Sequence, residues 1–269
     1  MYKALKRIIL ILDRFGCGWL VGIGLSTLVH RKLGPHRSGA ARGTLIALNP
    51  TRFRGDLEIL ESQGFRIISM PWHVQTALTS VHWPYDPGQF LLTKESYSDP
   101  LWSGAHKLTQ GLLSSIVRGL LFFWRIDGVI SAAIHYKHDH EWGIAFESVG
   151  VPYMVFHREN MTVASNQSKN QSIRAWRRLQ PFKGSHCIVH SQKMQQALIE
   201  SGYVAADKIS AYGALRMTRL AAHRDETVRS PKHGRPHITL FSFHLGAGLG
   251  IGPRLGNGTT EGFVELFKS

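Results

Sequence analysis

One pattern recurs along most of this chain: a short apolar run of strand length, then a segment with the periodicity of a helix. The expected strands are 44–48, 65–71, 127–136, 152–160, 186–191 and 208–213, and the expected helices are 53–63, 103–124, 139–149, 168–179 and 192–201. Strands that alternate with helices in this way form a parallel sheet through helical crossovers. The sequence therefore predicts an α/β protein with a Rossmann-like parallel sheet over residues 44–222.

Two local features qualify this pattern. Tryptophan and proline residues interrupt the stretch 72–100, where we expect a long loop. Asp139 precedes the third helical segment and is a candidate N-cap, because its carboxylate can accept hydrogen bonds from the first free backbone N–H groups of a helix. Under this interpretation, the polar run from His138 to Glu141 simply begins a helix.

The composition changes after the expected sheet. Residues 223–236 are polar and charged, with two prolines and a glycine, and are expected to form a linker. Residues 237–243 then form a new apolar strand pattern, and a glycine-rich loop and a short helix over 260–267 follow. One strand and one helix cannot build a domain, so we expect 237–269 to be the start of a second, incomplete domain.

The N-terminal segment 1–33 is basic, then apolar, then basic again. Its longest uncharged run, 15–29, is shorter than the ~20 residues that cross a bilayer as a helix. We expect an amphipathic segment that lies in the membrane plane, with Lys3, Lys6 and Arg7 toward anionic headgroups and Ile8, Ile9, Leu12 and Trp19 in the boundary region. The alternatives are packing on the body of the protein, a true span, or a cleaved signal peptide.

The formal charge of +14 is concentrated in two blocks, 1–42 and 168–235. Such blocks favour anionic partners, namely lipid, sugar nucleotides or nucleic acid, although a solvated basic face is the plain alternative. No recognised nucleic-acid-binding fold accompanies the basic helix 168–179, so nucleic acid is not expected. Cys17 and Cys187 lack CxxC partners, which favours a cytoplasmic location and argues against a disulfide framework.

Titratable and polar residues follow three of the expected strands. Ligands of open parallel sheets bind beyond the carboxyl ends of the strands, so these residues are candidate site residues. Glu159 and His157 are the candidate catalytic bases, Arg158 is the candidate anion contact, and the further substrate-binding candidates are His135, Tyr136, His190 and Ser191. A strand-end hydrogen-bond network is the alternative for 157–160. The spacing of His135, His138, His140 and Glu141 matches no known zinc motif, so neither a metal nor a cofactor is expected.

Three pieces of the chain resemble the GT-B glycosyltransferase type of bacterial surface-polysaccharide biosynthesis proteins. They are the strand with HREN (155–160), the unit from His186 that ends in YGALRMTRL (212–220), and the strand that runs into FSFHLGAG (241–248). The resemblance covers roughly 44–269 and implies two Rossmann-like domains that face each other across a cleft. YGALRMTRL is similar to a G-x-x-R-x-D motif, although Thr218 stands where the acidic residue usually occurs.

The resemblance implies substrate contacts at Gly213 and Arg216 and nucleotide contacts at Ser242, His244, Gly246 and Gly248. The glycine-rich loop there suits phosphate binding by backbone amides, although a flexible turn would have a similar composition. The expected function is sugar transfer in capsule or O-antigen synthesis, with a nucleotide sugar as donor and a glycan or lipid-linked acceptor. The protein is then expected to be peripheral at the inner face of the cell membrane. A non-catalytic truncated binding or assembly domain and a GT-B-fold UDP-sugar epimerase are the alternatives.

Overall fold

The computed structural model describes residues 2–28, 30–31, 41–158, 163 and 166–218, all of which belong to one compact unit, Met1–Arg219. Its strands are β1 (His30–Arg31), β2 (Gly43–Leu48), β3 (Phe65–Met70), β4 (Gly128–Ser131), β5 (Tyr153–His157), β6 (His186–Val189) and β7 (Ile209–Ala211). Its α-helices are α1 (Tyr2–Arg14), α2 (Gly18–Leu28), α3 (Asp56–Ser62), α4 (Trp72–Thr79), α5 (Lys94–Ser98), α6 (Pro100–Phe123), α7 (Lys137–Ser148), α8 (Asn166–Arg177) and α9 (Gln192–Glu200). The predicted linker and second domain, 223–236 and 237–269, lie outside the described residues.

The predicted parallel sheet is confirmed. The strand order is β1-β3-β2-β4-β5-β6-β7, and the six strands from β2 to β7 are all parallel. The sheet also has an antiparallel edge strand, β1, which pairs His30 with Ser69 and was not predicted. From β2 the chain first forms β3 on one side and then crosses to β4 on the other. The strand order therefore reverses between β2 and β4, the place where sheets of this type bind ligands.

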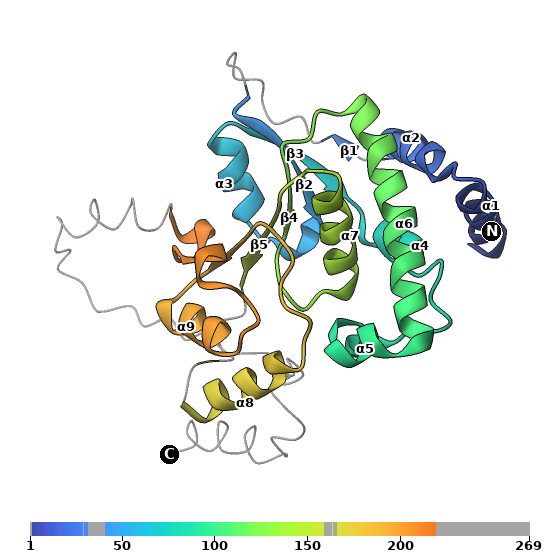
Figure 1. Ribbon diagram of the computed structural model, residues 1–269. Coiled ribbons are helices and arrows are strands. Elements are labelled where there is room, and N and C mark those ends of the chain that lie inside the picture. The colour runs from blue at the N-terminus through green and yellow to red at the C-terminus, as the bar shows by residue number, and fades with distance from the viewer. Residues whose placement is uncertain (1, 29, 32–40, 159–162, 164–165, 219–269) are drawn as a thin grey trace, which may run out of the picture. The chain divides into compact units, whose positions relative to one another are not determined.

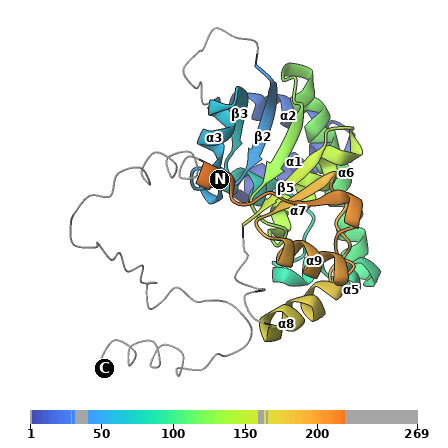
Figure 2. The same cartoon turned by 90° about the vertical axis from the view of Figure 1, so that its left-hand side faces the viewer.

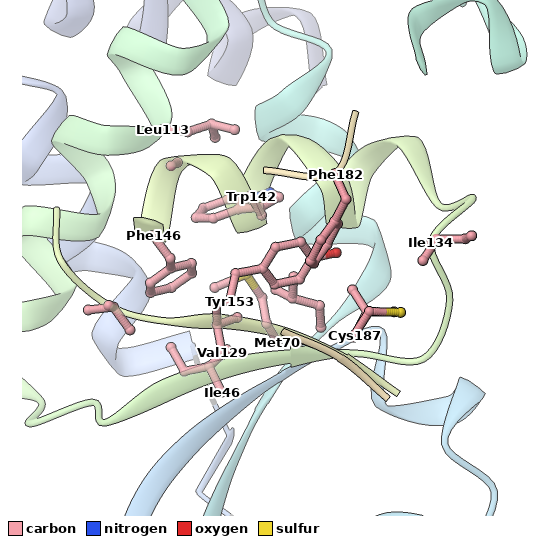
Figure 3. Close-up of a cluster of buried hydrophobic side chains, with 14 of the residues drawn as sticks. Ile46, Met70, Leu113, Val129, Ile134, Trp142, Phe146, Tyr153, Phe182 and Cys187 are labelled. Atoms are coloured by element: carbon pink, nitrogen blue, oxygen red, sulfur yellow. The ribbon is translucent and has the colours of Figure 1, made fainter. Parts of the chain in front are cut away.

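The two faces of the sheet are covered differently. Helices α4, α6 and α7 lie on one face, and α3 lies on the other (Figure 1); the turned view agrees for α3 and α6 (Figure 2). The larger core lies under α6 and α7, where Trp142, Phe146 and Tyr153 pack over Ile46 and Val129 (Figure 3). The smaller cluster packs α3 on Leu45, Ala47 and Ile130. Buried β-branched and aromatic side chains of this kind suit strands that are covered on both faces.

The stretch 72–100 is not the long loop that was predicted. It contains α4, a 3₁₀ turn (Gly88–Leu92) and α5. Pro71 ends β3 and precedes the first turn of α4, where no intrahelical N–H bond is lost. The N-cap of α5 is Thr93, whose hydroxyl accepts from the Ser96 amide. These short helices depend on tertiary packing, since isolated helices of this length are marginal in water.

The N-terminal segment forms two helices rather than one amphipathic unit. The helix α2 packs along α6 with almost no gap: a Cβ at Gly22 would lie 2.0 Å from the Ile116 carbonyl oxygen, and a Cβ at Gly119 would lie 2.0 Å from that of Trp19. At Gly18 the neighbour is the small Ser115 side chain. Glycine weakens an isolated helix in water, but Gly22 and Gly119 here allow close backbone contact between α2 and α6. Packing on the body of the protein is correct for α2.

No helix in the part of the chain that the structure describes is long and apolar enough to cross a membrane. On α1 and directly after it, the side chains of Ile8, Ile11 and Phe15 are 55%, 56% and 76% exposed. Ile9, which was predicted to enter the membrane boundary, is instead buried in the core. The Asp13 carboxylate lies 2.9 Å from His82 Nε2, and the Lys6 ammonium donates to the Ser80 carbonyl. These contacts attach one face of α1 to the segment that follows α4.

Candidate functional site

The candidate site lies at the carboxyl edge of the sheet, where the strand order reverses. The loop after β2 (49–55) provides Asn49, Thr51, Arg52 and Arg54, which together with Trp72 at the start of α4 line a pocket of about 320 Å³. Asn49 and Arg54 have positive φ values of 49° and 46°. Residues other than glycine adopt this conformation at a cost of on the order of 1–3 kcal/mol, and such strain clusters at functional sites.

Two arginines from distant parts of the chain flank one buried carboxylate beside this pocket. Asp56, 2% exposed, accepts from the Arg216 amide at 2.9 Å, and its Oδ2 lies 3.5 Å from Arg216 Nη1 and 3.6 Å from Arg158 Nε. Burial lowers the pKa of Arg158, and the positive charges of Arg216 and Arg54 lower it further. Two guanidinium groups thus share one carboxylate, and the charge of Arg54 adds to the surplus of positive charge in the cluster.

The arginine donors of this cluster are suited to bind an anion. Arg158 Nε is buried and has no hydrogen-bond partner among the described residues. Arg52 and Arg54 are exposed, and the Arg52 guanidinium lies 5.5 Å from the centre of the Tyr136 ring. Guanidinium groups bind carboxylates and phosphates through paired N–H donors. The arrangement can therefore hold a phosphorylated ligand at the mouth of the sheet.

The three histidines predicted to share this edge are close together. The rings of His135 and His157 meet edge to face at 5.1 Å, and His135 also stacks at 6.5 Å on Trp176. His157 is fully buried, and neither of its ring nitrogens has a partner among the described residues. Burial, followed by the neighbouring His135 and His190, holds the pKa of His157 well below its usual range. This imidazole is neutral at pH 7 and lies beneath the surface, so it is placed to support the edge rather than to reach an acceptor hydroxyl.

The other predicted site residues fall into two groups. Tyr136, Arg158, His190 and Arg216 lie with the arginine cluster. Ser191 is the N-cap of α9, where its hydroxyl accepts from the Met194 amide, and Gly213, with φ 82°, forms the turn after β7. Five predicted residues lie outside the described part of the chain: Glu159, Ser242, His244, Gly246 and Gly248.

The sequence analysis missed the residues that form the pocket itself. Asn49, Thr51, Arg52, Arg54, Asp56 and Trp72 were not singled out. A signal was present, because the run NPTRFRG (49–55) directly follows the first expected strand and has two arginines and a glycine. In a sheet of this type, the loop after the first strand borders the switch point.

Asp139 is not the N-cap of α7 as predicted. The helix begins at Lys137, and Asp139 is fully buried within its first turn, where Oδ2 accepts from the Ser131 hydroxyl at 2.7 Å. Burial raises the pKa of Asp139 to about 7, and the Ser131 hydrogen bond and the charge of Arg52 oppose this rise. Burial thus keeps part of this carboxyl group protonated near neutral pH, close enough to the pocket for the charge of Arg52 to act on it.

A second polar cluster has the geometry of a catalytic triad but not its accessibility. Ser96 Oγ lies 3.3 Å from His106 Nε2, and His106 Nδ1 lies 3.1 Å from Glu141 Oε1. Ser96 and Glu141 are fully buried, and the Ser96 hydroxyl donates to the Leu91 and Thr93 carbonyls. The Tyr97 ring stacks on His106 at 3.9 Å. A nucleophile must reach its substrate, so this network joins α5, α6 and α7 and is structural.

Known proteins provide no independent assignment: no protein-family model, no curated protein and no solved structure matches this chain.

Proposed function

We propose that this protein is a glycosyltransferase-like protein of surface-polysaccharide synthesis, in which the described domain contacts an acceptor and a nucleotide sugar is the donor. The observation that carries the proposal is the arginine-lined pocket at the switch point of a Rossmann-like sheet. Sugar nucleotides and lipid-linked acceptors both carry phosphate groups. Around Asp56 there are more guanidinium groups than carboxylates, which favours a phosphorylated ligand. Their positive charge would stabilise the negative charge that develops on a departing diphosphate.

Arg54 provides the sharpest test of anion binding, because it is exposed and its loss should not disturb the core. Arg54→Gln is expected to weaken binding of pyrophosphate and UDP about tenfold, since a hydrogen bond to a charged group contributes ~1.5–3 kcal/mol. Isothermal titration calorimetry at two salt concentrations measures this effect. The matched control is Arg177→Gln, which removes an exposed arginine from α8. An equal loss in both variants would mean that binding is non-specific attraction to a basic surface.

The chemistry itself is tested with a panel of sugar nucleotides. Transfer predicts release of the nucleotide that depends on an added acceptor, whereas an epimerase converts the sugar without an acceptor. Glu159 remains the predicted base, and Glu159→Gln separates loss of the carboxylate from loss of side-chain shape. If no sugar nucleotide in the panel is consumed, the transferase proposal fails.

We also propose that the protein is peripheral at the inner face of the cell membrane and that α1 is the contact. Ile8, Ile11 and Phe15 form an exposed apolar row, and Arg7 and Arg14 are exposed on the same helix. An apolar row with flanking cations binds the interface of an anionic bilayer. Helix α2 is not part of this proposed contact, because it packs on α6.

The double variant Ile11→Asp, Phe15→Asp is expected to abolish flotation with liposomes that contain phosphatidylglycerol. Both residues are exposed, so the fold should persist, whereas deletion of the whole segment would uncover α6. Leu101→Asp is the control, because Leu101 is 57% exposed at the start of α6. Flotation of the double variant at the level of the parent chain would exclude α1 as the membrane contact.

A further inference from the structure

A second pocket, of about 300 Å³, lies between α1, the end of α4 and the start of α7. It is lined by Lys6, Thr76, Ser80, Trp83, Pro84, Tyr85, Asp86 and His138. None of these residues lines the first pocket, which is called the arginine pocket below and is formed by Asn49, Thr51, Arg52, Arg54 and Trp72. The two pockets are neighbours, however, since Trp72 of the arginine pocket contacts the ring of His138 edge to face at 4.7 Å.

The wall of this second pocket contains three buried polar atoms without a hydrogen-bond partner in the described structure: Thr76 Oγ1, Trp83 Nε1 and His138 Nδ1. Trp83 and His138 are 5% and 4% exposed, and their rings stack at 5.1 Å. A buried polar atom that is left unpaired costs about 1–3 kcal/mol. Three residues with such an atom line the same cavity, which favours a polar occupant.

The charges around the pocket indicate that this occupant is neutral. Asp86 is paired with Lys137, which lowers the pKa of Asp86, and the Lys137 ammonium also lies 5.6 Å from the centre of the Trp83 ring. Lys6 donates to the Ser80 carbonyl at 3.4 Å. Burial lowers the pKa of His138 to about 4, so its imidazole is uncharged at neutral pH. In contrast to the arginine pocket, the residues that line this pocket include one ammonium group (Lys6) and one carboxylate (Asp86), so the lining itself has no net charge to select an anion.

The remaining lining residues favour a sugar ring. Tyr85, 61% exposed, offers aromatic surface to C–H groups, while Thr76, Trp83 and His138 each have a polar atom that makes no hydrogen bond within the described structure. The volume is at the lower end of the range for small-molecule sites, which suits one ring. We infer that this pocket binds a single neutral sugar residue, and, resting on the proposed function, that this residue belongs to the acceptor glycan.

The experiment uses the intact chain and a panel of methyl glycosides of glucose, galactose, mannose, rhamnose and N-acetylglucosamine. The signal is the indole N–H of Trp83 in ¹H–¹⁵N spectra, assigned by its loss in Trp83→Phe. At least one glycoside is expected to shift this signal at millimolar concentration. Thr76→Val keeps the side-chain shape and is expected to weaken that binding several-fold without lowering the melting temperature, because the hydroxyl has no partner to lose.

The matched control is Thr79→Val, one turn further along α4. The Thr79 hydroxyl donates to the Gln75 carbonyl at 2.7 Å and does not line the pocket, so its removal should lower stability and leave glycoside binding unchanged. If no glycoside shifts the Trp83 signal, or if Thr76→Val binds as the parent chain does, the inference is wrong. If inorganic phosphate shifts the signal instead, the pocket is an anion site and the neutral assignment fails.

The two proposals fail separately. Arg54→Gln should leave glycoside binding intact, because Arg54 lines only the arginine pocket. Glycoside binding without any sugar transfer would refute the transferase proposal and retain the sugar pocket. Sugar transfer that is unaffected by Thr76→Val would retain the transferase proposal and refute the sugar pocket.

Discussion

Gly22→Ala is expected to destabilise the protein by about 3 kcal/mol, the upper end of the usual range for overpacking. The added Cβ would lie 2.0 Å from the Ile116 carbonyl oxygen and within 3.0 Å of the Gly119 Cα, so both contacts are with backbone that cannot rotate away. The helices would have to separate, and the buried Leu25 would lose part of its packing. This loss exceeds the ~1 kcal/mol that alanine gains over glycine in a helix.

Gly24→Ala is the control on the same helix. A Cβ there meets nothing within 4 Å, so the substitution should stabilise the protein by up to ~1 kcal/mol through helix propensity alone. Urea denaturation of the two variants measures both effects. Opposite signs are expected; the same sign for both would show that α2 is not held against α6 by its glycines.

The second large effect concerns Asp139. Asp139→Asn is expected to stabilise the protein at pH 8 by up to roughly 4 kcal/mol, the free energy that corresponds to a pKa raised from 3.8 to about 7. The unfolded carboxyl group ionises near its ordinary pKa, while burial keeps the folded one protonated. Rising pH therefore favours the unfolded state of the parent chain between about pH 4 and pH 7. The asparagine variant has no such penalty.

The pH dependence is the discriminating measurement for Asp139. The difference in unfolding free energy between variant and parent should be smallest near pH 4, grow up to pH 7 and then remain constant. Ser131→Ala provides the companion variant, since it removes the hydroxyl that donates to Asp139 and leaves the carboxyl group in place. A difference that does not change with pH would mean that Asp139 is already ionised in the folded protein.

The sheet could be predicted from sequence because its signal is local. Runs such as 44–48 and 186–191 are apolar over the length of a strand, and turn or cap residues bound them. Gly202, for example, ends α9 with φ 70°. Helices α4 and α5 could not be predicted in the same way, since most of their buried residues, namely Gln75, Thr79 and Ser96, are polar. Such side chains are recognised as core only when the partners that enclose them are known.

Part of the candidate site could also be predicted from the sequence. His135, His157 and His190 were predicted to share one edge, because parallel strands end at the same side of a sheet. The central role of Asp56 was not foreseen, since its partners Arg158 and Arg216 come from segments about a hundred residues or more further along the chain, a separation for which loop length gives almost no constraint. The expected capping role of Asp139 failed for a related reason: the Ser131 hydroxyl competes for the carboxylate and lies inside the core.

The contact between Gly22 and Gly119 also has a consequence for the order of events during synthesis. About a hundred residues separate the two glycines, so at ~5–20 residues per second α2 emerges from the ribosome roughly 5–20 seconds before the helix that covers it. During that interval its apolar side chains and the Ile8–Ile11–Phe15 row of α1 have no partner within the nascent chain. A membrane or a chaperone that engaged α2 in this interval would have to leave it before α6 could pack against it.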